Sequence, residues 1–116
     1  MTDPIFRIAS PESFAEAALS GFYHGEDHDK ADGFIHASTR QQLADTLTLH
    51  YGDRDRVAIA QINPERLDAE LKWEPARDGS LFPHIYGDLN WSAVETVHLV
   101  KRSDDHSWRL PEELSA

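Results

Sequence analysis

The run Gly33-Phe34-Ile35-His36-Ala37-Ser38-Thr39 carries the strongest structural signal in the chain. Its two large apolar residues follow a glycine and favour extended backbone, which predicts a short buried strand. Ser38 and Thr39 are each followed three positions later by glutamine, the spacing of a capping box, which predicts a helix directly after the strand. A strand that ends at a helix N-terminus presents backbone N–H donors and a positive dipole to an anion. His36 lies at this junction and is therefore our leading candidate for a site residue.

The elements before this run are predicted from local signals. Ile5 to Ile8 is a strand candidate, and Ser10-Pro11-Glu12 combines a capping serine with a proline in the first helical turn. The helix that follows has an apolar face and should end at Gly21. We interpret the segment from Phe22 to Asp32, which is rich in Asp, Glu and His, as a polar loop.

After the run, apolar residues recur at helical spacing from Leu43 to Tyr51. Four strand candidates follow, and the first reads as an interior strand because it is apolar on both faces except at Gln61. The candidates cover 57–62, 69–74, 81–86 and 95–101, with a turn at Asp78-Gly79 and one helical turn at 90–94. Two helices in the first half and strands in the second predict an α+β fold rather than a βαβ repeat.

Length and composition predict one compact domain over residues 1–116, with a core from about 5 to 100 and a polar C-terminal tail from 103 to 116. The chain has no cysteine, which excludes disulfides, thiol catalysis and thiolate zinc sites. The net charge of −10 disfavours nucleic acid and anionic membranes as partners, although a local pocket could still bind a small anion. No apolar run is long enough to span a membrane, and the acidic N-terminus does not resemble a signal peptide. We therefore expect a cytoplasmic protein.

For each candidate residue a functional and a structural interpretation stay open. His36 could be a donor or general acid–base beside an anion or a ribose, or it could bridge strand and helix. Ser38 and Thr39 could bind the same ligand, or they could serve only as caps. Arg7, on the first strand, could bind a phosphate group or could extend its guanidinium to water.

The segment Phe82-Pro83-His84-Ile85-Tyr86-Gly87 is the second candidate region. Strand alternation would place His84 between the two aromatic residues on one face. Such a face could form the wall of a site for a base or a nicotinamide ring, or it could be a buried aromatic ladder at a sheet edge. Glu74 and Arg77 flank Pro75 nearby, and they could bind the ligand or form a surface ion pair.

The segment His24-Gly25-Glu26-Asp27-His28 contains the atoms of a metal site. Its two histidines are spaced to face the same way only on a helix, whereas Gly25 and the flanking charges favour a loop. The order of residues also differs from the zincin motif. We interpret the segment as a solvated loop and keep metal binding as an alternative.

Together these residues resemble the bacterial family known as domain of unknown function 952. The resemblance rests on the run 33–39 with Gln42, on Leu71-Lys72-Trp73-Glu74, and on the segment 82–87 followed by Ala93-Val94. It extends from about Ile5 to Val100. The name of that family indicates that its activity is not established.

A more distant resemblance is to the ADP-ribosyltransferase superfamily, closest to the RNA 2′-phosphotransferases, which use NAD to remove a phosphate. It places Arg7 as the basic residue of the first strand and His36-Ala37-Ser38 as a His-x-Ser pattern. It implies a split, twisted β-sheet with two main helices, and a pocket where His36 contacts the ribose or pyrophosphate of NAD. The segment from His84 to Tyr86 would form the far wall. Many members of the superfamily have a glutamate on a late strand, for which Glu74 and Glu95 are the candidates in this chain. The basic RNA-binding region of the phosphotransferases has no counterpart here.

These observations lead to one main hypothesis and two alternatives. The main hypothesis is a small enzyme or binding domain for NAD or a related nucleotide, acting by ADP-ribosyl-transfer chemistry. Its proposed catalytic residues are His36 and His84, and its proposed ligand-binding residues are Arg7, Ser38, Thr39, Glu74 and Tyr86. The first alternative is a non-catalytic module for a small ligand or a protein, with structural histidines. The second is a histidine and carboxylate metal site in the segment 24–28.

Overall fold

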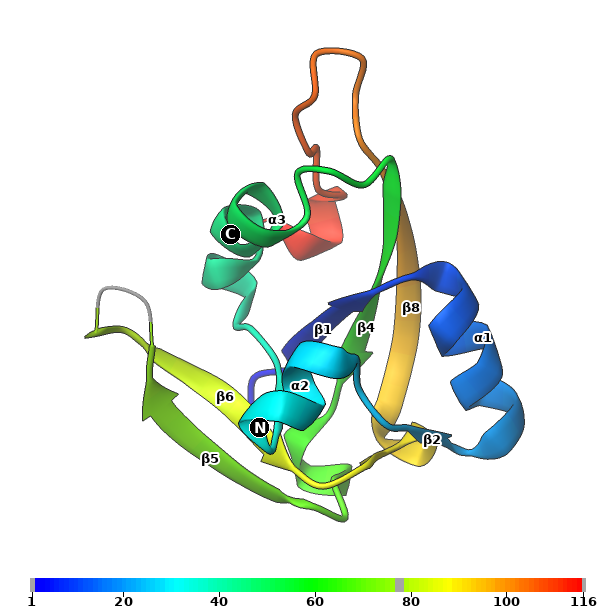
Figure 1. The fold of residues 1–116 in the computed structure, drawn as a ribbon, viewed down its shortest axis with the longest axis vertical. Coiled ribbons are helices and arrows are strands. Elements are labelled where there is room, and N and C mark those ends of the chain that lie inside the picture. Colours follow the sequence, from blue (N-terminus) through cyan, green and yellow to red (C-terminus); the bar gives the residue numbers. More distant parts are fainter. Residues whose placement is uncertain (1, 77–78, 116) are drawn as a thin grey trace.

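Short strands and short helices alternate along the computed structural model, which describes residues 2–76 and 79–115 (Figure 1). The strands are β1 (Ile5–Ala9), β2 (Phe22–Tyr23), β3 (Ile35–His36), β4 (Arg56–Ile62), β5 (Glu70–Pro75), β6 (Leu81–Tyr86), β7 (Leu89–Asn90) and β8 (Val94–Lys101). The α-helices are α1 (Pro11–Ser20), α2 (Asp27–Asp32) and α3 (Leu43–His50). Single 3-10 turns are η1 (Arg40–Gln42), η2 (Pro64–Arg66), η4 (Trp91–Ala93) and η5 (Glu112–Leu114).

Antiparallel pairing arranges the strands in three small sheets, in the orders β1-β4-β8, β2-β7 and β3-β6-β5. The first and third sheets meet where Phe6 and Ser38 exchange two backbone hydrogen bonds of 2.8 Å each. The predicted α+β class is thus confirmed. The radius of gyration of 13.4 Å is that of one compact domain of about this length. The meeting point brings the end of β3, with His36, beside β1.

Two apolar clusters lie on opposite faces of the sheet β1-β4-β8. Alternation along β1 sends Ile5 and Ala9 to one face and Phe6 and Ile8 to the other. Helix α1 packs on the first face and α3 on the second, so β4 is buried on both sides, as its apolar sequence predicts. The end of the chain, which we expected as a polar tail, contributes the fully buried Leu114 to the second cluster.

Helix α2 corrects the prediction of a polar loop over Phe22 to Asp32. Phe22 pairs with Asn90 in the sheet β2-β7, and the helix begins after Glu26. The carboxylate of Asp29 accepts the backbone N–H of Glu26 at 2.7 Å. Aspartate thus fills the role that Glu or Gln usually has three residues after a Ser or Thr cap. Gly33 ends the helix with a left-handed φ of 86°. The sequence lacks the usual cap signature here, which is why the helix was missed.

Among the described residues, no helix is long and apolar enough to cross a membrane. Arg77 lies outside the described residues, and so does Asp78 of the predicted turn at Asp78-Gly79. The start of α1 is confirmed, because the Ser10 side chain accepts the N–H of Ser13 and Pro11 occupies the first turn. Gly21 ends this helix, as predicted.

Replacing Thr39 with alanine should lower the free energy of unfolding by about 1 kcal/mol, because Thr39 caps η1. Its Oγ1 accepts the N–H of Gln42 at 3.3 Å, and its own N–H donates to Gln42 Oε1 at 2.9 Å. Urea denaturation would measure the change. Thr48→Ala is the matched control, since that hydroxyl only donates to Ala44 O within α3. An equal loss in both variants would contradict the capping role.

Candidate functional site

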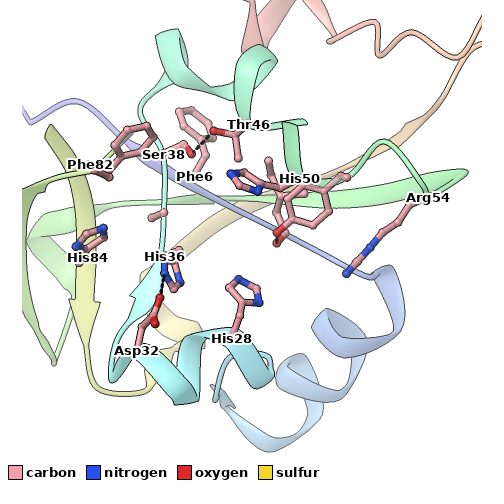
Figure 2. Close-up of a pocket in the computed structure, with 14 residues that line it drawn as sticks. Phe6, His28, Asp32, His36, Ser38, Thr46, His50, Arg54, Phe82 and His84 are labelled. Carbon is pink, nitrogen blue, oxygen red and sulfur yellow. Dashed lines mark hydrogen bonds and ion pairs between the residues drawn. The ribbon is translucent and has the colours of Figure 1, made fainter. Parts of the chain in front are cut away.

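A pocket of about 480 Å³ opens between α2, α3 and the strands β1, β3 and β6 (Figure 2). Four histidines and one arginine line it together with aromatic and hydroxyl side chains, and Asp32 is its one acidic residue among the described residues. The lining residues are Phe6, Ile8, His28, Asp32, His36, Ala37, Ser38, Thr46, His50, Tyr51, Arg54, Ala76, Phe82 and His84. The pocket therefore combines four imidazoles and one guanidinium with apolar and aromatic surface.

His36 lies between two carboxylates at the floor of this pocket. Its Nδ1 is 2.6 Å from Asp29 Oδ1, and its Nε2 is 2.9 Å from Asp32 Oδ2. Carboxylate oxygens only accept hydrogen bonds, so the imidazole of His36 is the donor in these contacts. The side chain of His36 is 32% exposed, and that of Asp29 only 2%. One nitrogen of the imidazole is thus held by the buried Asp29, while the other nitrogen faces the pocket.

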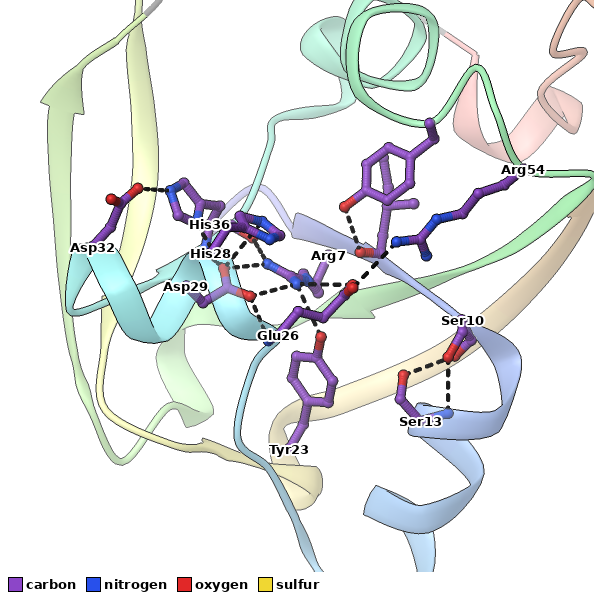
Figure 3. A network of polar contacts seen from close by, with 12 residues as sticks. Arg7, Ser10, Ser13, Tyr23, Glu26, His28, Asp29, Asp32, His36 and Arg54 are labelled. Carbon is purple, nitrogen blue, oxygen red and sulfur yellow. Dashed lines mark hydrogen bonds and ion pairs between the residues drawn. The ribbon is translucent and has the colours of Figure 1, made fainter.

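Asp29 is the centre of a buried polar network (Figure 3). Both of its oxygens accept from the Arg7 guanidinium at 2.7 Å, in a bidentate pair. The backbone N–H groups of His36 and Glu26 donate to it at 2.9 and 2.7 Å. Burial alone would raise the pKa of Asp29, but the hydrogen bonds from His36 and Arg7 outweigh burial and hold that pKa well below its ordinary value. Asp29 is therefore a permanent anion that orients His36.

Arg7 points inward, so its guanidinium does not extend to water as one of our interpretations expected. The residue is 1% exposed and is not among the residues that line the pocket. Besides Asp29 it donates to the hydroxyl of Tyr23 at 2.9 Å and to the carbonyl of His36 at 2.9 Å. Burial raises the pKa of Tyr23 to about 12, which keeps this phenol neutral. Arg7 thus ties β1 to α2 and β3 from inside the fold.

His84 has a carboxylate partner of its own. Its Nδ1 is 2.9 Å from Glu74 Oε1, and the same oxygen accepts the hydroxyl of Tyr86 at 2.6 Å. The hydrogen bonds from Tyr86 and His84 lower the pKa of Glu74. Phe34 stacks on His84 with ring centroids 4.0 Å apart. The strand β6 lies between β3 and β5, so the alternative of a ladder at a sheet edge is wrong.

The two histidines predicted as catalytic lie in one pocket. His36 and His84 are opposite each other in the pairing of β3 with β6, and their ring centroids are 5.7 Å apart. Each Nδ1 faces a carboxylate, which fixes the ring and favours a proton on that nitrogen. The pair therefore consists of two oriented imidazoles that could exchange protons with one ligand.

The other predicted ligand-binding residues divide into two groups. Ser38 lines the pocket, where its hydroxyl lies 3.2 Å from Thr46 Oγ1. Thr39, Glu74 and Tyr86 do not line it. Thr39 caps η1, whereas Glu74 and Tyr86 lie behind His84 and support it.

Two titratable residues of the pocket, His50 and Arg54, were not among the predicted site residues, and His28 was considered only as a metal ligand. His28 stacks loosely on His36 with ring centroids 5.0 Å apart, and His50 lies on α3. Arg54 packs its guanidinium over the Tyr51 ring at 4.9 Å and pairs with Glu26 at 3.2 Å. Tyr51 and Arg54 follow the helix in the sequence, and nothing in the local sequence indicates that they reach the pocket. Only the docking of α3 brings them there.

Metal ligation is the remaining interpretation of the histidine-rich segment. His28, Asp29 and His36 offer ligand atoms within 4.8 Å of one another. His24 is not among them and pairs with Asp88 at 2.9 Å instead. Both oxygens of Asp29 already accept hydrogen bonds, two of them from a buried arginine that would repel a cation. These contacts favour a charge-paired network over a metal centre.

Solved structures of one bacterial protein share this fold. The crystal structure of protein CC0527 from Caulobacter crescentus has a TM-score of 0.87 and 31% identity, over 96% of this chain and 97% of that chain. Its solution NMR structure has a TM-score of 0.81 and 30% identity, over 95% of each chain. No curated protein matches the chain. These descriptions name no activity, so the ADP-ribosyltransferase resemblance stays a prediction.

The family match covers the elements that build the pocket. The model described as "Protein of unknown function (DUF952)" matches residues 8–97, a range that includes α2, β3, α3 and β6. That range contains both oriented histidines. The resemblance found in the sequence is thereby confirmed, and the chain belongs to the DUF952 family.

Proposed function

We propose that the pocket binds NAD or a related nucleotide, that His84 accepts a proton in the reaction of this ligand, and that His36 contacts its phosphate groups. The observation that carries the proposal is the pair of carboxylate-backed imidazoles, with ring centroids 5.7 Å apart, in a pocket that Arg54 and two further histidines also line. Oriented imidazoles in a concave site are the usual means of acid–base chemistry near neutral pH.

The composition of the lining supports a nucleotide as the ligand class. A pocket of about 480 Å³ is in the ordinary range for small-molecule sites. Phe6, Tyr51 and Phe82 supply apolar and aromatic surface, as a planar base requires. Arg54 and His50 supply groups that can pair with phosphate oxygens. Arg7 is buried and does not line the pocket, so we assign the phosphate contact to Arg54, which lines it and would exchange its pairing with Glu26 for the phosphate.

For ADP-ribosyl transfer, the proposed reaction is attack by an acceptor hydroxyl or amine on the ribose carbon that bears nicotinamide. The bond from that carbon to the pyridinium nitrogen breaks, and its electron pair leaves with neutral nicotinamide. The acceptor loses its proton to an imidazole, for which His84 is positioned because its Nδ1 faces Glu74. His36 would contact the pyrophosphate. Catalysis then rests on positioning and electrostatics.

A second candidate function is non-catalytic binding of the same ligand class. It is favoured by the network around Asp29, in which His36 has a role in the fold as well as in the pocket. The two functions predict the same affinity pattern. They differ in whether nicotinamide is released from NAD when a hydroxyl or amine acceptor is supplied.

Calorimetric titration with NAD, ADP-ribose and nicotinamide tests the proposal. We expect saturable binding of NAD or ADP-ribose, accompanied by an increase of Tm. Arg54→Ala and His84→Ala should each raise Kd about tenfold or more, which corresponds to about 1.4 kcal/mol. His24→Ala is the matched control, because that histidine is 60% exposed and pairs with Asp88 outside the pocket.

Absence of binding for all three compounds would contradict the proposal. An equal loss of affinity in the His24 variant would also contradict it, since the pocket would then not be the site. Circular dichroism and Tm of each variant without ligand would show whether the fold is intact. If only His84→Ala fails to fold, the Kd of Arg54→Ala still tests whether this pocket is the binding site.

A further inference from the structure

Asp32 is the one acidic side chain among the described residues that line the pocket, whose other polar groups are imidazoles, hydroxyls and the guanidinium of Arg54. Its Oδ2 lies 2.9 Å from His36 Nε2 (Figure 2). No helix role explains an aspartate at this place, because it is the last residue of α2 and a carboxylate there opposes the helix dipole. The contact with His36 is therefore the feature of Asp32 that needs an explanation.

The two partners of this contact differ in how firmly they are held. His36 is fixed from behind, because its Nδ1 contacts the buried Asp29, which Arg7 holds at both oxygens. The side chain of Asp32 is 55% exposed, so it can rotate into water. When Asp32 rotates away, Nε2 of His36 remains in place and faces the pocket as a hydrogen-bond donor.

The surroundings of this nitrogen suit an anion better than they suit any neutral group. The rings of His28 and His84 lie 5.0 and 5.7 Å from the ring of His36. Without the Asp32 carboxylate, three imidazoles would surround one position where an anion could bind. We call this position the anion seat, and no other acidic side chain is among the described lining residues. A phosphate oxygen could take the position that Asp32 Oδ2 occupies and accept the same hydrogen bond.

The geometry points to Asp32 as a stand-in for the ligand: its carboxylate occupies the seat of a phosphate group at His36 Nε2, and the ligand must displace it. This inference rests on the proposed function, whose ligand it describes more closely. Asp32 lowers affinity for anions in general and so selects for ligands that gain enough elsewhere in the pocket. The same side chain closes the seat when the pocket holds no ligand.

The test compares Asp32→Asn with the unmodified protein in calorimetric titrations with inorganic phosphate and with ADP-ribose, at constant ionic strength. We expect the variant to bind both probes at least threefold more tightly. Asp27→Asn is the matched control, because it removes the same charge from the exposed start of the same helix. That control should change Kd by less than twofold. The comparison separates the local effect of Asp32 at His36 from the general effect of removing one negative charge.

Each outcome has a distinct meaning. Tighter phosphate binding by Asp32→Asn without any binding of NAD or ADP-ribose would uphold the anion seat and overturn the nucleotide proposal. Binding of ADP-ribose that is unchanged or weaker in Asp32→Asn would uphold the nucleotide site and overturn the stand-in role. Equal gains in the Asp27 and Asp32 variants would likewise overturn it. Failure of every protein to bind either probe would overturn both.

Discussion

Asp29→Asn is expected to lower the free energy of unfolding by about 3–5 kcal/mol, the usual cost of removing one partner from a buried ion pair. The substitution keeps the shape of the side chain but leaves Arg7, which is 1% exposed, without its anionic partner. An amide can also accept only at one of its two ends, whereas both oxygens of Asp29 accept hydrogen bonds. At the upper end of this range the variant would be largely unfolded at 37 °C.

Urea denaturation monitored by tryptophan fluorescence would measure this loss. Asp27→Asn is the control, since Asp27 is an exposed aspartate two positions earlier on the same helix. We expect the control to change stability by less than about 0.5 kcal/mol. A loss below 1 kcal/mol in Asp29→Asn would mean that the network contributes little to folding, and our account of Arg7 would be wrong.

The lowered pKa of Asp29 also sets a pH dependence with a definite sign. A carboxyl whose pKa is lower in the folded state than in the unfolded state adds stability above its unfolded pKa, which is about 3.9. That contribution is lost progressively as the pH falls below about 4. The stability difference between the unmodified protein and Asp29→Asn should therefore be largest above pH 5 and should shrink toward pH 2. A constant difference over that range would contradict the assignment.

Leu47→Ala is expected to cost about 2–5 kcal/mol, because it removes buried apolar surface and leaves a cavity. Leu47 is fully buried on the face of α3 that packs against Phe6, Ile59 and Leu114. Leu49→Ala is a closely matched control, with the same substitution two residues later on the same helix, where the side chain is 60% exposed. The control should stay within about 0.5 kcal/mol of the unmodified protein.

This second substitution also tests how the pocket depends on α3. Thr46 and His50 flank Leu47 on the helix and line the pocket. We expect weaker binding of ADP-ribose by Leu47→Ala, with near-normal affinity for Leu49→Ala. Thermal unfolding followed by circular dichroism, with and without the ligand, would give both numbers. Similar stabilities for the two variants would show that α3 does not dock as the structure describes.

Local sequence signals predicted the elements well where the signal and its partner are close in the chain. Ser10 and Gly21 bound α1 as expected, and the two-sided apolar run 57–62 became the interior strand β4. The pair Thr39 and Gln42 forms its reciprocal cap. In each case the interaction spans few residues, so its energy depends little on the rest of the fold.

The site was predicted in part, and the errors have one physical origin. His36 was recognised by its place at the end of a strand and His84 by its place between two aromatic residues of one strand face, and both line the pocket. Arg7 was expected at a phosphate, but its partner is Asp29, 22 positions away. A buried charge must find an opposite charge, and nothing in the sequence around either residue indicates which one it finds. Helix α2 was missed because its cap lacks the usual Ser or Thr, and the sequence does not show that Asp29 belongs to this cap and to the ion pair at once.

By itself the sequence determined the α+β class, the bounds of most strands and helices, and which two histidines to suspect. These features follow from periodicity, capping and turn chemistry, which act between neighbours in the chain. Only the tertiary structure decided that the two histidines share one pocket, that Arg54 and not Arg7 lines it, and that Asp32 contacts His36 there. Those facts depend on strand register and on the docking of α2 and α3, which bring together residues separated by long stretches of chain. Long-range packing and charge pairing set them, and neither leaves a local mark in the sequence.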